Sequence, residues 1–204
     1  MKKFIKLLKQ TDNKWLNLYK ATYINKKNKE DTWEFSSRHD PLVKRDRADA
    51  IVVPALLGDK MVVIKQFRPS LGDYIIENVA GLIEDGYSIH DMARKEVWEE
   101  TGLKVIRIFD FHSLIVDEKV FDKILFNSPG ITDDSVTYVF AEVEGEPTNK
   151  YAHDSEDIEV LTLDRFEAKE LMNSEVQFSA KCWLILMAWI SGYDWFWWTK
   201  IKGF

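Results

Sequence analysis

The sequence predicts an α/β protein with a mixed sheet, preceded by a small antiparallel β subdomain. Two nearly continuous apolar runs, residues 50–57 and 61–67, flank a turn at 58–60. They predict buried strands, because a strand covered on both faces is apolar throughout. Strand and helix signals alternate after these runs, whereas a hairpin precedes them all, so we expect parallel and antiparallel pairs in one sheet. With 204 residues, 46% of them hydrophobic, the chain can form one compact domain with an appended part.

The remaining elements follow from local signals along the chain. The expected hairpin joins residues 15–24 to 32–38 through the polar turn 25–29. A charged stretch, 38–49, then marks a boundary, so we expect an N-terminal β subdomain at 1–45 and a second domain at 46–204. Further strands are expected at 74–76, 105–111, 135–143 and 158–163. Helices are expected from Ser88 to just before Gly102, over 165–172, and from about Val176. A glycine loop at Ala80 and Gly81 is expected ahead of the first of these helices.

Composition and charge narrow the functional classes. The chain carries 28 basic and 34 acidic residues, a net charge of −6, which argues against a nucleic-acid binder because phosphate contacts need a clustered basic surface. A single cysteine, Cys182, cannot form an internal disulfide. The lysine-rich start, residues 1–9, does not resemble a secretory signal. We therefore expect a cytoplasmic protein.

An acidic helix near the middle of the chain is the most informative segment. Glu99 and Glu100 come three and four residues after Glu96. In a helix this spacing places Glu96 and Glu100 on one face, with Glu99 beside them. They also lie in the last turn, where the helix dipole favours cations over anions. A solvated acidic surface is one explanation. The other is a bound hard divalent cation, Mg²⁺ or Mn²⁺, for which carboxylate oxygens are suitable ligands.

The segment 81–103 resembles a Nudix box, the pattern that defines a superfamily of diphosphate hydrolases. The positions that match it are Gly81, Glu96, Val97, Glu99, Glu100, Gly102 and Leu103. Two positions depart from it, since the box has a glutamate where this chain has Tyr87 and an arginine where it has Lys95. Lys95 keeps the charge but lacks the planar fork that holds a carboxylate bidentately. In the superfamily these two positions support the catalytic helix rather than supply its main metal ligands, so the resemblance implies that the departures bear on the rate more than on metal binding.

The flanking segments resemble the ADP-sugar pyrophosphatases of that superfamily, especially those that act on ADP-ribose. The resemblance is carried by residues 65–69 and 77–81 ahead of the box, by 128–134 and 156–160 behind it, and by 14–15, 32–34 and Arg38 at the front. It implies an α/β/α sandwich with a mixed sheet. It also implies a homodimer that exchanges the N-terminal β subdomains, a nucleoside diphosphate sugar as substrate, and Mg²⁺ as cofactor.

The resemblance also assigns roles to individual residues. The metal would be held by Glu96, Glu100 and the carbonyl of Ala80, with Glu77 nearby. The attacking water would lose its proton to an acidic loop at 153–157, to Glu156 first or Asp154 second, with Glu99 as a further catalytic candidate. Six residues would contact the substrate: Trp15, Trp33, Glu34, Arg38, Arg68 and Gly81. Trp15 and Trp33 would sandwich the adenine, one from each subunit.

Plainer explanations stay open for several of these residues. Both tryptophans can simply pack the hairpin against the core, and the acidic loop can be a solvated turn. The apolar run 182–190, followed by aromatic residues at 195–198, predicts a core helix with an aromatic tail, since the run is too short to span a bilayer. An interfacial membrane contact is the minority alternative. Two other functions also stay open, namely a catalytically weak nucleotide sensor and a Nudix hydrolase for a different nucleoside diphosphate derivative.

Overall fold

The computed structural model describes residues 4–43, 45–109 and 124–192. The chain divides into two compact units, one formed by residues 1–49 with 122–137 and the other by residues 50–121 with 138–204. The first unit therefore includes a segment from the middle of the chain in addition to the N-terminal part, which ends close to the boundary expected near residue 45. Each unit is described by itself.

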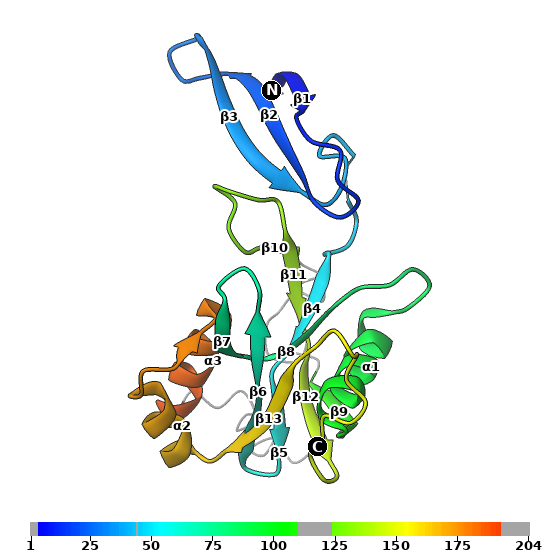
Figure 1. Cartoon of the computed structure of the whole chain (residues 1–204), viewed down its shortest axis with the longest axis vertical. Coiled ribbons are helices and arrows are strands. Elements are labelled where there is room, and N and C mark those ends of the chain that lie inside the picture. Colours follow the sequence, from blue (N-terminus) through cyan, green and yellow to red (C-terminus); the bar gives the residue numbers. More distant parts are fainter. Residues whose placement is uncertain (1–3, 44, 110–123, 193–204) are drawn as a thin grey trace. The chain divides into compact units, whose positions relative to one another are not determined.

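A three-stranded antiparallel sheet forms most of the first unit (Figure 1). Its strands are β1 (Phe4–Lys9), β2 (Asn17–Ile24) and β3 (Glu30–Ser37), in that order across the sheet. The β2–β3 hairpin confirms the hairpin expected from the sequence. Its turn forms because the Asn25 side chain accepts hydrogen bonds from the backbone of Lys27 and Lys29, while Asn28 adopts a positive φ of 57°. Strand β1 was not expected from the sequence.

A buried carboxylate, Asp49, ties the later segment of this unit to the earlier one. Strands β10 (Leu125–Phe126) and β11 (Ser135–Tyr138) pair antiparallel, and the backbone N–H of Ser135 donates to Asp49 at 2.8 Å. Arg45 and His39 also bind this carboxylate. Burial opposes its ionisation, but the hydrogen bonds from Arg45 and Ser135 outweigh that cost and lower the pKa of Asp49.

The second unit contains a mixed sheet, as the sequence predicts. Its strands are β5 (Ala55–Leu57), β6 (Lys60–Arg68), β7 (Asp73–Glu77), β9 (Lys104–Phe109), β12 (Phe140–Glu144), β13 (Ile158–Leu163) and β14 (Gln177–Phe178). They run in the order β14-β7-β6-β5-β12-β9, and β13 also pairs with β6. The pairs β12–β5 and β14–β7 are parallel, and the remaining pairs are antiparallel. A separate antiparallel pair joins β4 (Ala50–Val53) to β8 (Val79–Leu82).

Three helices in the described part of this unit cover its strands: α1 (Ile89–Thr101), α2 (Arg165–Met172) and α3 (Ala180–Ile190). Met61 and Val63, which lie on one face of β6, pack in one core cluster with Leu186 and Trp189 of α3. Helix α1 contacts β4, β8 and β9 instead. Figure 1 shows α1 apart from α2 and α3, with the strands between them.

Two of the expected helices are confirmed at both ends. Ser88 caps the start of α1 by accepting from the backbone N–H of Asp91, and Gly102 ends it in the left-handed conformation at φ 67°. Helix α2 occupies the expected residues 165–172 and begins with a complete capping box. The described residues contain no helix that is long and apolar enough to cross a bilayer.

Four expectations about element boundaries were wrong. The third helix begins at Ala180 rather than near Val176, because Ser179 caps it and β14 pairs with β7 just before it. Ala80 and Gly81 lie in strand β8 rather than in a loop. The run 50–57 divides at Pro54, which has no backbone N–H to donate to a ladder, so that β4 pairs with β8 and β5 with β6. The run 135–143 likewise divides at Val139 into β11 and β12.

The aromatic tail, residues 195–198, lies outside the described residues, as do positions 110–111 of the strand expected at 105–111.

Candidate active site on helix α1

Two carboxylates one helical turn apart form the centre of the candidate site. Glu96 and Glu100 lie on the face of α1 that packs against β8. Glu100 is only 2% exposed, and its Oε2 accepts a hydrogen bond from the backbone N–H of Ala80 at 3.4 Å. The helix therefore presents its acidic turn to the protein interior, which excludes the solvated-surface explanation for Glu100.

Gly81 allows this close approach. A Cβ at this position would lie 2.0 Å from the Cδ of Glu96 and 2.2 and 2.4 Å from its two oxygens. Real Cβ atoms essentially never come within 3.0 Å of another heavy atom. Only glycine therefore lets β8 pass beside the Glu96 carboxylate without moving it.

The two carboxylates resist ionisation. Burial is the main cause for Glu96, with the charges of Glu99, Glu156 and Glu84 adding to it and Lys95 opposing it, and together they raise its pKa to about 7. For Glu100, burial followed by the charges of Glu96 and Glu156 raises the pKa well above its usual range, while the Ala80 N–H and Arg68 act in the opposite direction.

The raised pKa values of Glu96 and Glu100 are what a site for a hard divalent cation would show in the absence of the ion. Oxygen ligands of this kind are the ones that Mg²⁺ and Mn²⁺ prefer, and a cation would favour the ionised forms that burial penalises. Glu96, Glu100 and the carbonyl of Ala80 are the groups that would hold it. Within the described parts of the chain, the side chains do not form a ready-made group of three or more His, Cys, Asp or Glu with metal-site geometry.

Lys95 joins two other carboxylates beside this pair. Its Nζ donates to Glu84 Oε1 at 3.0 Å and to Glu99 Oε2 at 2.9 Å. Burial lowers the pKa of Lys95, but these two hydrogen bonds outweigh that effect and raise it above its ordinary value. Glu99 is therefore engaged by Lys95 next to the site. The lysine that departs from the box pattern still bridges two acidic residues through a single nitrogen.

Arg68 and Glu77, which the resemblance assigns to substrate and metal respectively, contact each other. The Arg68 Nε donates to Glu77 Oε2 at 2.5 Å, from neighbouring strands β6 and β7. The Arg68 charge also reaches Glu100, where it favours ionisation. Arg68 thus places a cationic group near the acidic pair.

The β12–β13 loop (residues 145–157) brings a further carboxylate to the site. Glu156 is partly covered, whereas Asp154 and His153 are exposed, and the Glu156 charge raises the pKa of both Glu96 and Glu100. The Glu156 N–H donates to the carbonyl of His153 at 2.8 Å. Of the two loop carboxylates expected to be catalytic, Glu156 is the one whose charge acts on the acidic pair.

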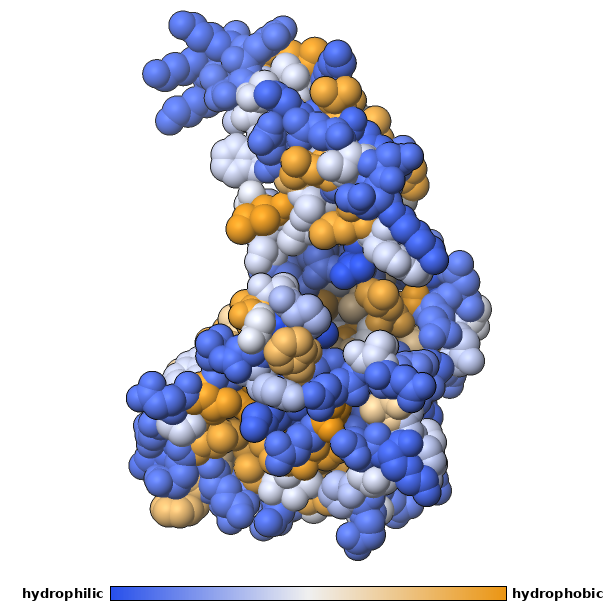
Figure 2. Space-filling view, viewed as in Figure 1, coloured by the Kyte–Doolittle hydropathy of each residue, from blue (hydrophilic) through white to orange (hydrophobic). Residues whose placement is uncertain are grey.

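The substrate-binding candidates of the first unit are mostly exposed. Trp15 is 67% and Trp33 52% exposed, so neither is a core residue of the sheet, and the Trp33 indole N–H donates to the carbonyl of Gly130 at 3.0 Å. Glu34 is exposed beside Lys20, at 3.8 Å, and Arg38 lies 3.7 Å from Asp134. Figure 2 shows apolar side chains at the surface of this unit.

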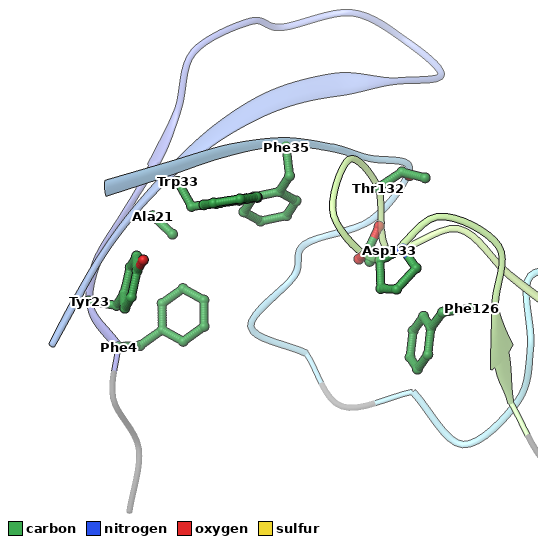
Figure 3. A pocket seen from close by; sticks show the side chains of 9 residues that line it. Phe4, Ala21, Tyr23, Trp33, Phe35, Phe126, Thr132 and Asp133 are labelled. Atoms are coloured by element: carbon green, nitrogen blue, oxygen red, sulfur yellow. The ribbon is translucent and has the colours of Figure 1, made fainter. Parts of the chain in front are cut away.

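An aromatic pocket of about 420 Å³ adjoins Trp33 within the same unit. Figure 3 shows the rings of Phe4, Tyr23, Trp33 and Phe35 around it, from all three strands of the sheet. Phe126, Thr132 and Asp133 line its other side. Sequence reasoning singled out Trp33 alone, because rings on three separate strands carry no common local pattern. It also missed Glu84, whose only signal was its place inside the box.

Comparison with known proteins identifies the family. The model of the NUDIX domain matches residues 46–182, about two thirds of the chain. The chain belongs to the Nudix family. The matched range includes α1, β8 and the β12–β13 loop.

Three curated relatives are similar to this chain in sequence. An ADP-sugar pyrophosphatase of Mus musculus is 38% identical over 102 residues, which cover 46% of this chain and 44% of the relative. An ADP-ribose pyrophosphatase of Saccharomyces cerevisiae is 31% identical over 144 residues, 66% of this chain and 55% of the relative. An uncharacterized Nudix hydrolase of Schizosaccharomyces pombe is 30% identical over 146 residues, 70% of this chain and 66% of that protein. The chain thus spans about half to two thirds of the length of these curated relatives.

A solved structure supports the α/β Nudix fold that the resemblance implies. The crystal structure of an ADP compounds hydrolase superposes with a TM-score of 0.70 and covers 94% of this chain and 95% of its own. At 15% identity, this likeness concerns the fold alone.

Proposed function

We propose that this Nudix protein hydrolyses the diphosphate linkage of ADP-ribose or a related nucleoside diphosphate sugar. The products would be AMP and a sugar phosphate, and for ADP-ribose the sugar phosphate is ribose 5-phosphate. The observation that carries the proposal is the pair formed by Glu96, which is partly buried, and Glu100, which is buried, because the raised pKa values of both indicate a site that a bound cation would stabilise. The names of the Mus musculus and Saccharomyces cerevisiae relatives support the choice of substrate.

The residues at the site divide the chemistry among them. A bound Mg²⁺ would neutralise the diphosphate oxygens and acidify a water molecule. Glu96, Glu100 and the Ala80 carbonyl would hold the ion, and Gly81 keeps β8 close enough for them to act together. Glu156 would accept the proton of the attacking water, since it is the loop carboxylate whose charge reaches the acidic pair. Arg68 would contact a phosphate oxygen, and Glu77 orients its guanidinium.

The aromatic residues of the first unit would bind the base. The exposure of Trp15 and Trp33 supports stacking on adenine over a role in packing the hairpin. Glu34 and Arg38 would contact the base, the ribose or a phosphate. A homodimer that exchanges the β subdomains, with each subunit supplying one tryptophan, remains part of the proposal. So does a cytoplasmic location, which the composition with its single cysteine supports.

The proposal is tested by measuring AMP release from ADP-ribose in Mg²⁺, with Glu100→Gln as the test variant. We expect turnover in the wild type and a loss of at least about 10²-fold in the variant, because a neutral amide cannot replace an anionic ligand. Glu170→Gln, an exposed glutamate on α2, is the matched control and should keep wild-type turnover.

The same experiment separates the competing functions. Tight ADP-ribose binding by the wild type without AMP release would contradict the hydrolase and favour a nucleotide sensor. A panel of other nucleoside diphosphate derivatives, compared by kcat/KM, then decides the substrate. A higher kcat/KM on one of these than on any ADP-sugar would contradict the proposed substrate class but not the chemistry.

A further inference from the structure

The β12–β13 loop, which carries Glu156, is held against the catalytic helix by an aromatic stack. The indole of Trp98 on α1 and the ring of Tyr151 in the loop lie 4.6 Å apart between centroids and 23° from parallel. The two residues are 45% and 39% exposed. Both rings are therefore partly exposed, and a pair in this geometry contributes about 0.5–1.5 kcal/mol beyond the area that it buries. Figure 1 shows the loop passing beside α1 before it enters β13.

Neighbouring contacts place the stack between two fixed points. Before it, the backbone N–H of Thr148 donates to the carbonyl of Thr101, the last residue of α1, at 2.8 Å. After it, the carbonyl of Asp157 accepts from the backbone N–H of Phe67 at 3.1 Å, and its carboxylate accepts from the Tyr74 hydroxyl. The segment that bears Glu156 spans the gap between these anchors. Within that span, the stack and an ion pair between His153 and Glu99, at 4.0 Å, connect the loop to α1.

Trp98 lies between the acidic residues in the chain, on a different face of the helix. Glu96 and Glu100 face β8, and Trp98, which is offset from each by two positions, points outward toward the loop. One face of the helix therefore carries the two carboxylates, and a different face contacts the loop through Trp98. Because Glu96 and Glu100 are fixed on the helix, a shift of the loop relative to α1 changes the distance from Glu156 to the acidic pair.

We propose that the Trp98–Tyr151 stack positions Glu156 for proton abstraction, so that both aromatic residues are positioning residues for the reaction. This inference rests on the proposed function, in which Glu156 takes the proton of the attacking water. The stack acts after the substrate is bound. Its loss therefore lowers kcat, while the KM for ADP-ribose, set by the base and phosphate contacts, stays nearly constant.

The test is a set of substitutions on each side of the stack. In Trp98→Ala and Tyr151→Ala, kcat for ADP-ribose should fall by about 2- to 12-fold, the range that corresponds to one aromatic pair, while KM changes less than about 2-fold. The double variant should be no worse than the poorer single one, because both remove the same contact. Trp98→Phe and Tyr151→Phe keep a stacking ring and should recover most of the rate.

A second measurement reads the loop without using activity. Trypsin cleaves after Lys150, which is exposed in the loop and lies over the Tyr151 ring at 4.9 Å. Cleavage there should be about 2- to 12-fold faster in Trp98→Ala. The matched control is Trp183→Ala on α3, which removes a 38% exposed tryptophan from another aromatic pair and should leave both kcat and cleavage at Lys150 unchanged.

The outcomes separate this inference from the function on which it rests. A wild type that releases no AMP defeats the proposed function, and the trypsin measurement still decides whether the stack holds the loop. Wild-type kcat and unchanged cleavage in Trp98→Ala overturn the inference while leaving the hydrolase intact. Phe variants as impaired as the Ala variants also overturn it, because stacking would then not be the cause.

Discussion

The approach of β8 to α1 at Gly81 gives the sharpest prediction. In Gly81→Ala the new Cβ would lie 2.0 Å from the Glu96 Cδ, and ordinary contact begins at 3.4 Å. The Glu96 carboxylate must therefore retreat by about 1.4 Å. A misplacement of about 1 Å can cost 10²-fold in rate, so kcat for ADP-ribose should fall by at least about 10²-fold, or roughly 2.7 kcal/mol of activation free energy.

The free energy of unfolding should respond differently from kcat. Glu96 is only partly buried and can move outward, so Gly81→Ala should change the unfolding free energy by less than about 1 kcal/mol. Gly58→Ala is the contrasting control, because its φ of +62° strains any side chain although the space around it is open. It should destabilise the protein by about 1–2 kcal/mol and leave kcat unchanged.

Steady-state AMP release and urea unfolding of both variants are the measurements. Wild-type kcat in Gly81→Ala would refute the reasoning, because it would mean that the position of Glu96 does not matter to the reaction. A parallel loss of stability and activity in both variants would also refute it.

Three further predictions concern charge and stacking. Because the folded-state pKa values of Glu96 and Glu100 are raised, the free energy of unfolding of the metal-free protein should fall as the pH rises from about 4.5 to about 7. Mg²⁺ binds the ionised carboxylates, so in thermal unfolding it should stabilise the protein more at about pH 7.5 than at about pH 5.5. Trp33→Ala should raise the KM for ADP-ribose by about 5- to 150-fold, as should Trp15→Ala, with little change in kcat, and an unchanged KM in both would exclude base stacking. Lys95→Gln leaves its two carboxylate partners unneutralised and should cost about 1 kcal/mol of unfolding free energy, whereas Lys95→Arg should cost less than half of that.

Local sequence signals predicted the elements that local physics controls. Ser88 and Gly102 marked the ends of α1 because a side-chain cap and a left-handed glycine act within a few residues. The mixed sheet followed from apolar runs flanked by turn residues. The errors fell where a strand pairing replaced a local preference, as at β14, where two residues that could have extended α3 pair with β7 instead.

The sequence by itself determined the family and the acidic face of α1, because a helical period of 3.6 residues fixes which glutamates share a face. Only the tertiary structure decided that Glu100 is buried, that Arg68 is paired with Glu77, and that the charge of Glu156, more than fifty residues away in the chain, acts on the acidic pair. Such contacts depend on which strands pair and on how closely β8 approaches the helix. Those long-range choices are set by the packing of the whole domain, which leaves no periodic pattern around any one of the residues involved.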